Sequence, residues 1–101
     1  MHYTYMVRCA DDSLYTGWTT DLEARVKTHN SGQGAKYTKP RRPVVLVWHH
    51  QSEDKIVAQR LERRIKKLTK SQKERLVADP SLLKSFCGEV WEVDDNEKCK
   101  K

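Results

Sequence analysis

The alternation of hydrophobic and polar positions predicts three strands and three helices in the order β-β-α-β-α-α. Residues 3–9 and 14–19 are rich in aromatic and β-branched side chains and flank Asp11-Asp12-Ser13, a turn signal, which predicts a β-hairpin. Residues 44–48 form a continuous apolar run after Pro43, which is typical of a buried strand. We therefore expect an α+β fold with a small three-stranded antiparallel sheet flanked by helices.

Two of the predicted helices have clear apolar faces. The first is predicted to begin with Thr20 as its cap, because Thr20 and Glu23 have the spacing of a capping box. Its apolar face holds Leu22, Val26 and His29. Ser52 is the predicted cap of the second helix. The apolar stripe of that helix consists of Val57, Leu61, Ile65 and Leu68.

The third predicted helix is short and closes the predicted domain. Ser71 and Glu74 have the spacing of a second capping box. With 101 residues the chain has room for one domain. We expect this domain to span residues 1–80 and to be followed by a C-terminal extension over residues 81–101. The extension is expected to be partly disordered, above all over residues 94–101.

Charge is distributed unevenly along the chain. Lys and Arg number 20 against 14 Asp and Glu, which gives a net charge of +6. Residues 1–78 hold 16 of the basic and 8 of the acidic side chains. Such a basic body favours a polyanion, above all nucleic acid, as its partner. The alternative is that the charge serves solubility alone.

The cysteines and the hydropathy exclude several classes of protein. Cys9, Cys87 and Cys99 are scattered and form no Cys-x-x-Cys pair, so we expect no zinc site. Scattered cysteines and the lack of a signal peptide favour a reduced, cytoplasmic setting. No apolar run approaches the roughly 20 residues that a membrane span needs, so we expect no membrane partner.

Tyr5 and Tyr15 are candidate functional residues because they lie on the two strands of the predicted hairpin. Side chains on one face of adjacent strands lie within reach of each other. Such a pair is usually structural, but a phenol beside a phosphodiester can also serve as a general base. Gly17 stands in the same strand as Tyr15, where glycine often marks a close approach to the backbone.

Arg25 and His29 are four residues apart and therefore project from neighbouring parts of the first helix. An arginine on a helix is most often a solvated surface charge, but it can also fork onto a phosphate. A histidine on an apolar face is more often packed than reactive, but its pKa also suits a proton shuttle.

Glu62 is a candidate ligand for a divalent cation. It lies in a strongly basic stretch, next to Leu61 and three residues before Ile65. One interpretation is local charge balance with Arg63 or Lys66. The other is that Glu62 binds Mg²⁺, which takes one or two carboxylates together with water and phosphate oxygens.

Taken together, these residues resemble the GIY-YIG nuclease superfamily, specifically its small single-domain bacterial members, over roughly residues 3–78. Tyr15-Thr16-Gly17 matches the second family motif, and Tyr3-Thr4-Tyr5 keeps the final tyrosine of the first. Residues 21–30 resemble the family helix, with Arg25 at the position of the catalytic arginine. Residues 34–38, followed by Arg41-Arg42-Pro43, resemble the basic loop of the small members. Residues 61–66 place Glu62 at the position of the metal-binding glutamate.

The resemblance implies hydrolysis of DNA phosphodiester bonds with one Mg²⁺ or Mn²⁺ ion. Tyr15 would act as the general base or position the attacking water, and Tyr5 would hold the substrate or tune Tyr15. Arg25 would stabilise the charge that develops on the phosphate. Glu62 would hold the ion, and His29 would support the site.

The expected partner is DNA, including branched, nicked or single-stranded forms. The residues expected to contact it are Gly17, Lys36, Lys39, Arg41, Arg42, Arg63 and Lys66. Trp18 stands where some active relatives carry a lysine that lowers the pKa of the base, and Lys36 is the loop residue that could replace it. An alternative function is a nucleic-acid-binding module of the same fold with weak or no catalysis. A third interpretation is a structural or partner-binding role, in which the acidic C-terminal tail docks on another protein or on the basic body, and the sequence identifies no such partner.

Overall fold

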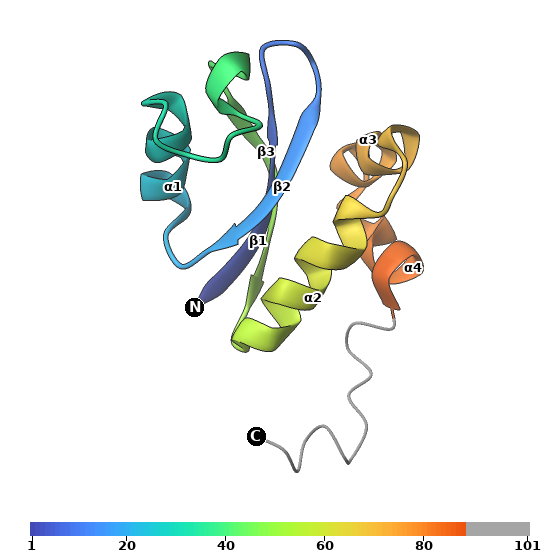
Figure 1. Cartoon of the computed structure of the whole chain (residues 1–101). Helices are drawn as coiled ribbons and strands as arrows, with labels where there is room; N and C mark the ends of the chain where they lie inside the picture. Colours follow the sequence, from blue (N-terminus) through green and yellow to red (C-terminus); the bar gives the residue numbers. More distant parts are fainter. Residues whose placement is uncertain (89–101) are drawn as a thin grey trace.

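The computed structural model describes residues 1–88 and shows a three-stranded antiparallel sheet (Figure 1). The strands are β1 (His2–Arg8), β2 (Leu14–Thr19) and β3 (Val45–Ser52). They lie in the order β2-β1-β3, so the first strand of the chain is the central one. The predicted α+β class and the antiparallel sheet are confirmed. The third strand extends four residues beyond the predicted apolar run, as far as Ser52.

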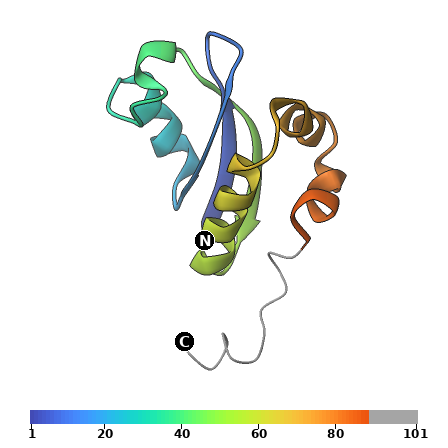
Figure 2. The same ribbon diagram turned by 45° about the vertical axis from the view of Figure 1, so that its right-hand side comes forward.

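Helices cover both faces of the sheet. In chain order they are α1 (Leu22–Asn30), the 3₁₀ turn η1 (Lys39–Arg41), α2 (Lys55–Lys66), α3 (Lys70–Ala78), the 3₁₀ turn η2 (Pro80–Leu82) and α4 (Leu83–Cys87). Figures 1 and 2 both place α1 on one side of the sheet and α2, α3 and α4 on the other. Within residues 1–88, no helix is long and apolar enough to span a membrane.

The register of the sheet places both candidate tyrosines on the α1 face. Tyr5 pairs with Gly17, and Val7 pairs with Tyr15. Successive side chains of a strand point to opposite faces, so Tyr5 and Val7 share one face, while Met6 lies on the other. The two tyrosines are therefore diagonal neighbours, which is the proximity that the predicted hairpin requires.

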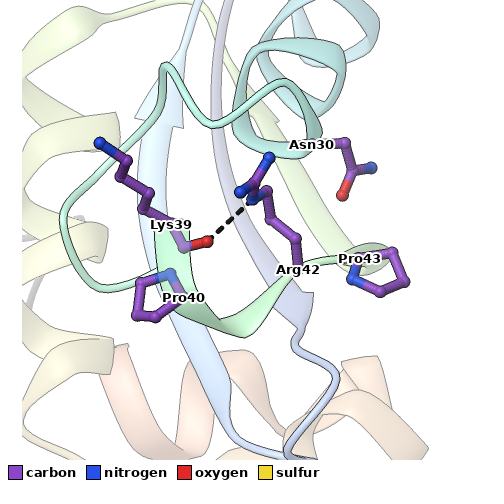
Figure 3. A pocket seen from close by; sticks show the side chains of 5 residues that line it. All are labelled: Asn30, Lys39, Pro40, Arg42 and Pro43. Atoms are coloured by element: carbon purple, nitrogen blue, oxygen red, sulfur yellow. Dashed lines mark hydrogen bonds between the residues drawn. The ribbon is translucent and has the colours of Figure 1, made fainter.

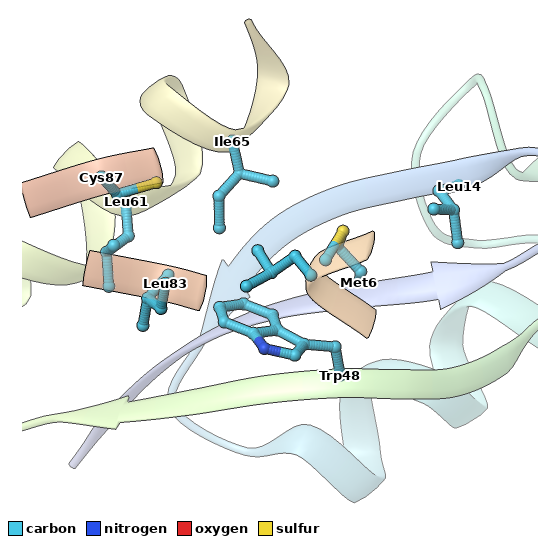
Figure 4. Packing of buried hydrophobic residues seen from close by; sticks show 8 residues of the cluster. Met6, Leu14, Trp48, Leu61, Ile65, Leu83 and Cys87 are labelled. Carbon is cyan, nitrogen blue, oxygen red and sulfur yellow. The ribbon is translucent and has the colours of Figure 1, made fainter. Parts of the chain in front are cut away.

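The larger core lies between the sheet and the C-terminal helices (Figure 4). Its buried residues are Met6, Leu14, Trp48, Leu61, Ile65, Leu76, Leu83 and Cys87. Two of them, Leu83 and Cys87, come from α4, a helix that was not predicted because five residues are too few to show a helical period. The predictions made for residues 89–101 lie outside the described residues.

The predicted helix caps were each wrong by one or two residues. The observed N-caps are Asp21, Asp54 and Thr69, in place of Thr20, Ser52 and Ser71. Ser52 still belongs to β3, where it pairs with His2. Thr69 forms a reciprocal capping box with Gln72, which satisfies two backbone N–H groups at once.

Glu74, which was predicted to be part of a capping box, instead binds Arg8. The two side chains form a bidentate pair with both N–O distances at 2.7 Å, and this pair joins β1 to α3. Hydrogen bonding to Arg8 holds the pKa of Glu74 below its ordinary value of 4.5. The pair thus stabilises the docking of α3 only while Glu74 is ionised.

We expect Glu74→Gln to lower the free energy of unfolding by about 1 kcal/mol near neutral pH, because one partner of a half-exposed pair is lost. Since the folded pKa is lowered, this contribution is present above pH 4.5 and disappears as the pH falls through the folded value. A double-mutant cycle of Arg8→Met and Glu74→Gln, measured by chemical denaturation at several pH values, gives the coupling energy. A coupling that persists unchanged in acid contradicts the prediction.

Candidate active site

Tyr5 lies at the centre of a buried cluster that joins β1 to α1. Its hydroxyl oxygen is 2.8 Å from Nε2 of His29 and accepts a hydrogen bond from Nε of Arg25 at 3.3 Å. Burial raises the pKa of Tyr5, against the hydrogen bond and charge of Arg25, and the charges of Tyr15 and Glu62 add to the rise. Tyr5 is therefore a neutral phenol near pH 7, suited to hydrogen bonding and not to acting as a base.

Because Gly17 has no side chain, the ring of Tyr5 can occupy the space next to its Cα. A Cβ at position 17 would lie 2.6 Å from the hydroxyl oxygen of Tyr5 and 2.8 Å from its Cζ. We expected this glycine to allow a phosphate to approach the backbone beside Tyr15. The structure supplies a different reason, because the ring of Tyr5 crosses β2 at the point where a side chain is missing.

His29 is fully buried, and both of its ring nitrogens are engaged. Nε2 faces Tyr5, and Nδ1 lies 2.8 Å from Oγ1 of Thr38. Burial lowers the pKa of His29, and the charge of Arg25 lowers it further, so the imidazole is neutral near pH 7. Both nitrogens that a proton shuttle would use are therefore engaged within the protein, and His29 contacts the candidate site through Tyr5.

Thr38 is the site residue that sequence analysis missed. It lies in the basic loop, residues 33–43, and is fully buried, although its neighbours Tyr37 and Lys39 are exposed. Gly34 of the same loop packs against His29, because a Cβ there would lie 2.9 Å from the Cα of His29. The loop has no hydrophobic period, so nothing in its sequence distinguished this threonine from an exposed one.

Tyr15 lies next to the cluster and is partly exposed. Its ring centroid is 5.4 Å from that of His29, and the ring of Tyr37 stacks on it at 5.9 Å. The ammonium nitrogen of Lys66 lies 5.6 Å from the centroid of the Tyr15 ring. We expected Lys36 of the basic loop to place its charge beside Tyr15. Within residues 1–88, the ammonium group that lies over the Tyr15 ring is instead that of Lys66.

Glu62 approaches the site from α2, which contacts both β1 and β2. Its side chain is 21% exposed, and its carboxylate lies 3.6 Å from the ammonium group of Lys66. Among residues 1–88, no three His, Cys, Asp or Glu side chains are placed to hold a metal ion together. The carboxylate of Glu62 is an oxygen donor of the type that Mg²⁺ binds together with water and phosphate oxygens.

The basic residues of the loop fall into two groups. Arg41 lies 4.0 Å from the centroid of the Tyr37 ring and donates to Asp11 at 2.9 Å, and Arg42 donates to the carbonyl of Lys39 at 2.8 Å. Both arginines therefore hold the loop together. Lys36 and Lys39 are exposed, as is Arg63 on α2, and within residues 1–88 none of the three forms an ion pair.

An open hollow of about 450 Å³ lies beside this loop (Figure 3). It is lined by Asn30, Lys39, Pro40, Arg42 and Pro43. The amide of Asn30 is already bonded to both backbone groups of Val44. None of the lining residues belongs to the cluster around Tyr5, so the hollow is separate from the candidate site.

Comparison with known proteins gives three kinds of match. The GIY-YIG catalytic domain profile matches residues 1–75, a range that includes Tyr5, Tyr15, Arg25 and Glu62. A UPF0213 protein of Staphylococcus haemolyticus is 53% identical over 78 residues, which cover 77% of this chain and 95% of that protein. The NMR structure of the UPF0213 protein BH0048 of Bacillus halodurans is 42% identical, with a TM-score of 0.52, over 83% of this chain and 93% of the other. The NMR structure of the protein EF2693 from E. faecalis is 41% identical, with a TM-score of 0.55, and the match covers 80% of this chain and 86% of the other.

Proposed function

Because the chain belongs to the GIY-YIG nuclease family, we propose that it hydrolyses phosphodiester bonds of DNA with the help of one Mg²⁺ or Mn²⁺ ion. The resemblance predicted from the two tyrosine motifs is thereby confirmed, and the activity is our inference. The observation that carries it is the convergence of Arg25 and Tyr15 around the buried Tyr5–His29 pair. Glu62 lies on α2, and Lys66, its ion-pair partner, lies beside the ring of Tyr15.

Arg25 is suited to stabilise negative charge on a phosphate. Its Nε is bonded to Tyr5, which fixes the plane of the guanidinium group. Within residues 1–88, its two terminal amino groups have no recorded hydrogen bond, and the side chain is partly exposed. Both groups are thus available for the forked contact that arginine makes with phosphate oxygens.

Tyr15 is the phenol that a substrate can reach, since Tyr5 is only 1% exposed. We assign to Tyr15 the role of general base or of positioning the attacking water. The stack on Tyr37 and the packing against His29 restrict its ring. Tyr5 and His29 are positioning residues in this proposal.

Glu62 would hold the metal ion, with water and substrate oxygens as the other ligands. When bound, such an ion supplies positive charge that neutralises the leaving oxygen. The same carboxylate lies 3.6 Å from the ammonium group of Lys66. The exposed Lys36, Lys39 and Arg63 are suited to contact the DNA backbone.

A cleavage panel tests the proposed function. We expect the purified chain to cut at least one of branched, nicked or single-stranded DNA in Mg²⁺ or Mn²⁺. Tyr15→Phe should lower the rate by about 100-fold, the range of a lost general base. Tyr3→Phe removes a hydroxyl from a tyrosine on the same sheet outside the cluster, and it should leave the rate unchanged.

Two results bear against this function. A cleavage rate that is the same in Tyr15→Phe as in the wild type would mean that Tyr15 is not the base or that the activity comes from a contaminating nuclease. Binding that weakens with salt but is never followed by cleavage, at high protein excess and with either metal, would favour the nucleic-acid-binding module instead.

A further inference from the structure

Four buried or half-buried side chains form one continuous hydrogen-bonded chain from the basic loop to Arg25. Oγ1 of Thr38 lies 3.0 Å from the carbonyl oxygen of Ala35 and 2.8 Å from Nδ1 of His29. Nε2 of His29 lies 2.8 Å from the hydroxyl of Tyr5, which accepts from Arg25 at 3.3 Å. Thr38 and His29 are 0% exposed. Solvent therefore does not compete for these bonds.

The direction of the chain follows from counting hydrogens. A threonine or tyrosine hydroxyl has one hydrogen, and a neutral imidazole carries one on either nitrogen. If Nδ1 of His29 carries it, Thr38 donates to Ala35, His29 donates to Thr38, and Tyr5 donates to His29. The opposite tautomer makes one bond fewer and leaves the hydrogen of Tyr5 without a partner, which is costly in a buried site.

We propose that Thr38 is a positioning residue, which fixes His29 as the Nδ1–H tautomer and thereby, through Tyr5, holds Arg25 at the candidate active site. A hydroxyl that donates becomes a better acceptor, so the bond from Tyr5 to His29 strengthens the bond that Tyr5 accepts from Arg25. The effect on cleavage rests on the proposed function, whereas the tautomer of His29 does not.

This chain of bonds couples the basic loop to the guanidinium group. Thr38 lies between Tyr37, which stacks on Tyr15, and Lys39, which is exposed. Moving Thr38 therefore disturbs Tyr15 through Tyr37 and Arg25 through His29. A loop that lacks the hydroxyl keeps its basic residues but loses its connection to Arg25.

The tautomer is measured directly by ¹⁵N NMR of the histidine side chains at neutral pH, with His29 assigned from the spectrum of His29→Asn. We expect the wild-type chain and Thr38→Ser to show the Nδ1–H tautomer. In Thr38→Val, which has the same shape without the hydroxyl, each tautomer of His29 makes one hydrogen bond with Tyr5, so the preference for Nδ1–H should be lost and a substantial Nε2–H population should appear. An Nε2–H tautomer in the wild type, or an undiminished Nδ1–H population in Thr38→Val, overturns the proposal.

Cleavage kinetics give the second measurement. We expect Thr38→Val to lower kcat by about tenfold with little change in KM, because a transition-state contact of Arg25 is weakened. Thr38→Ser should retain the wild-type rate, which a purely steric role of the threonine does not predict. If Thr38→Val fails to fold, the proposal is still tested by the tautomer of His29 in the wild type and by the cleavage rate of Thr38→Ser. A wild type without any cleavage overturns the proposed function and leaves the NMR result to test the tautomer.

Discussion

Glu62→Gln is expected to abolish most of the metal-dependent cleavage while the fold stays intact. We expect the single-turnover rate at saturating metal to fall by at least ~100-fold, because the amide has no charge to hold the cation at the scissile phosphate. Within residues 1–88, no three His, Cys, Asp or Glu side chains are placed to hold a metal ion together, so no cluster of protein ligands stands ready to replace Glu62. The loss should therefore not be recovered by raising the metal concentration moderately.

Stability and a matched variant separate this effect from misfolding. The recorded ion pair of Glu62 is with Lys66, which is 48% exposed, so the free energy of unfolding should change by less than about 0.5 kcal/mol. Glu53→Gln removes the same charge at an exposed position just before α2, and it should keep the wild-type rate. Binding of Mn²⁺, followed by calorimetry, should weaken in Glu62→Gln and not in Glu53→Gln. Equal rates for the two variants would rule out Glu62 as the metal ligand.

Local sequence patterns predicted most of the elements of the fold. Alternation and the turn at Asp11-Asp12-Ser13 predicted the hairpin, and the apolar run predicted β3, because these signals arise within a few residues. The caps were misplaced because serine, threonine and aspartate all suit an N-cap, and several of them precede each helix. The end of β3 was missed for a related reason: its last residues, such as His49 and Gln51, are polar and exposed.

The candidate site was predictable only in part. The proximity of the two tyrosines and the helical spacing of Arg25 and His29 are local features, which the hairpin and the helix predicted. That the two pairs form one site was expected only from the resemblance to the GIY-YIG family. Three contacts were missed: Thr38 with His29, Lys66 with Tyr15, and Tyr5 with Gly17. The first two join elements whose relative placement no local period encodes. The third lies within the predicted hairpin, but it depends on the exact register of the two strands and on the direction of the Tyr5 ring.

Gly17→Ala tests the third of these contacts and should damage both stability and activity. The new methyl group would lie 2.6 Å from the hydroxyl oxygen of Tyr5 and 2.8 Å from Cζ, so the ring or the strand must move. Tyr5 is 1% exposed and packed on both sides, which leaves little room for adjustment. We expect the free energy of unfolding to fall by about 1–3 kcal/mol, the range for overpacked cores.

Gly88→Ala is the matched control, because a Cβ at position 88 meets no atom within 4 Å and the backbone there is already helical. It should leave the free energy of unfolding within about 0.5 kcal/mol of the wild type. Equal stabilities of the two alanine variants in chemical denaturation would show that Tyr5 does not need the space above Gly17.

The cleavage rate of Gly17→Ala should fall by more than its stability explains. Displacing the hydroxyl of Tyr5 breaks its bonds to His29 and Arg25 together, so the guanidinium loses its anchor even in molecules that remain folded. Tyr5→Phe removes the hydroxyl without adding volume and should lower the rate to a similar extent. Because both changes remove the same anchor, the double variant should lose less activity than the product of the two single effects. Independent effects on the rate would instead mean that Gly17 acts on the substrate directly, by the close backbone approach that its place beside Tyr15 first indicated.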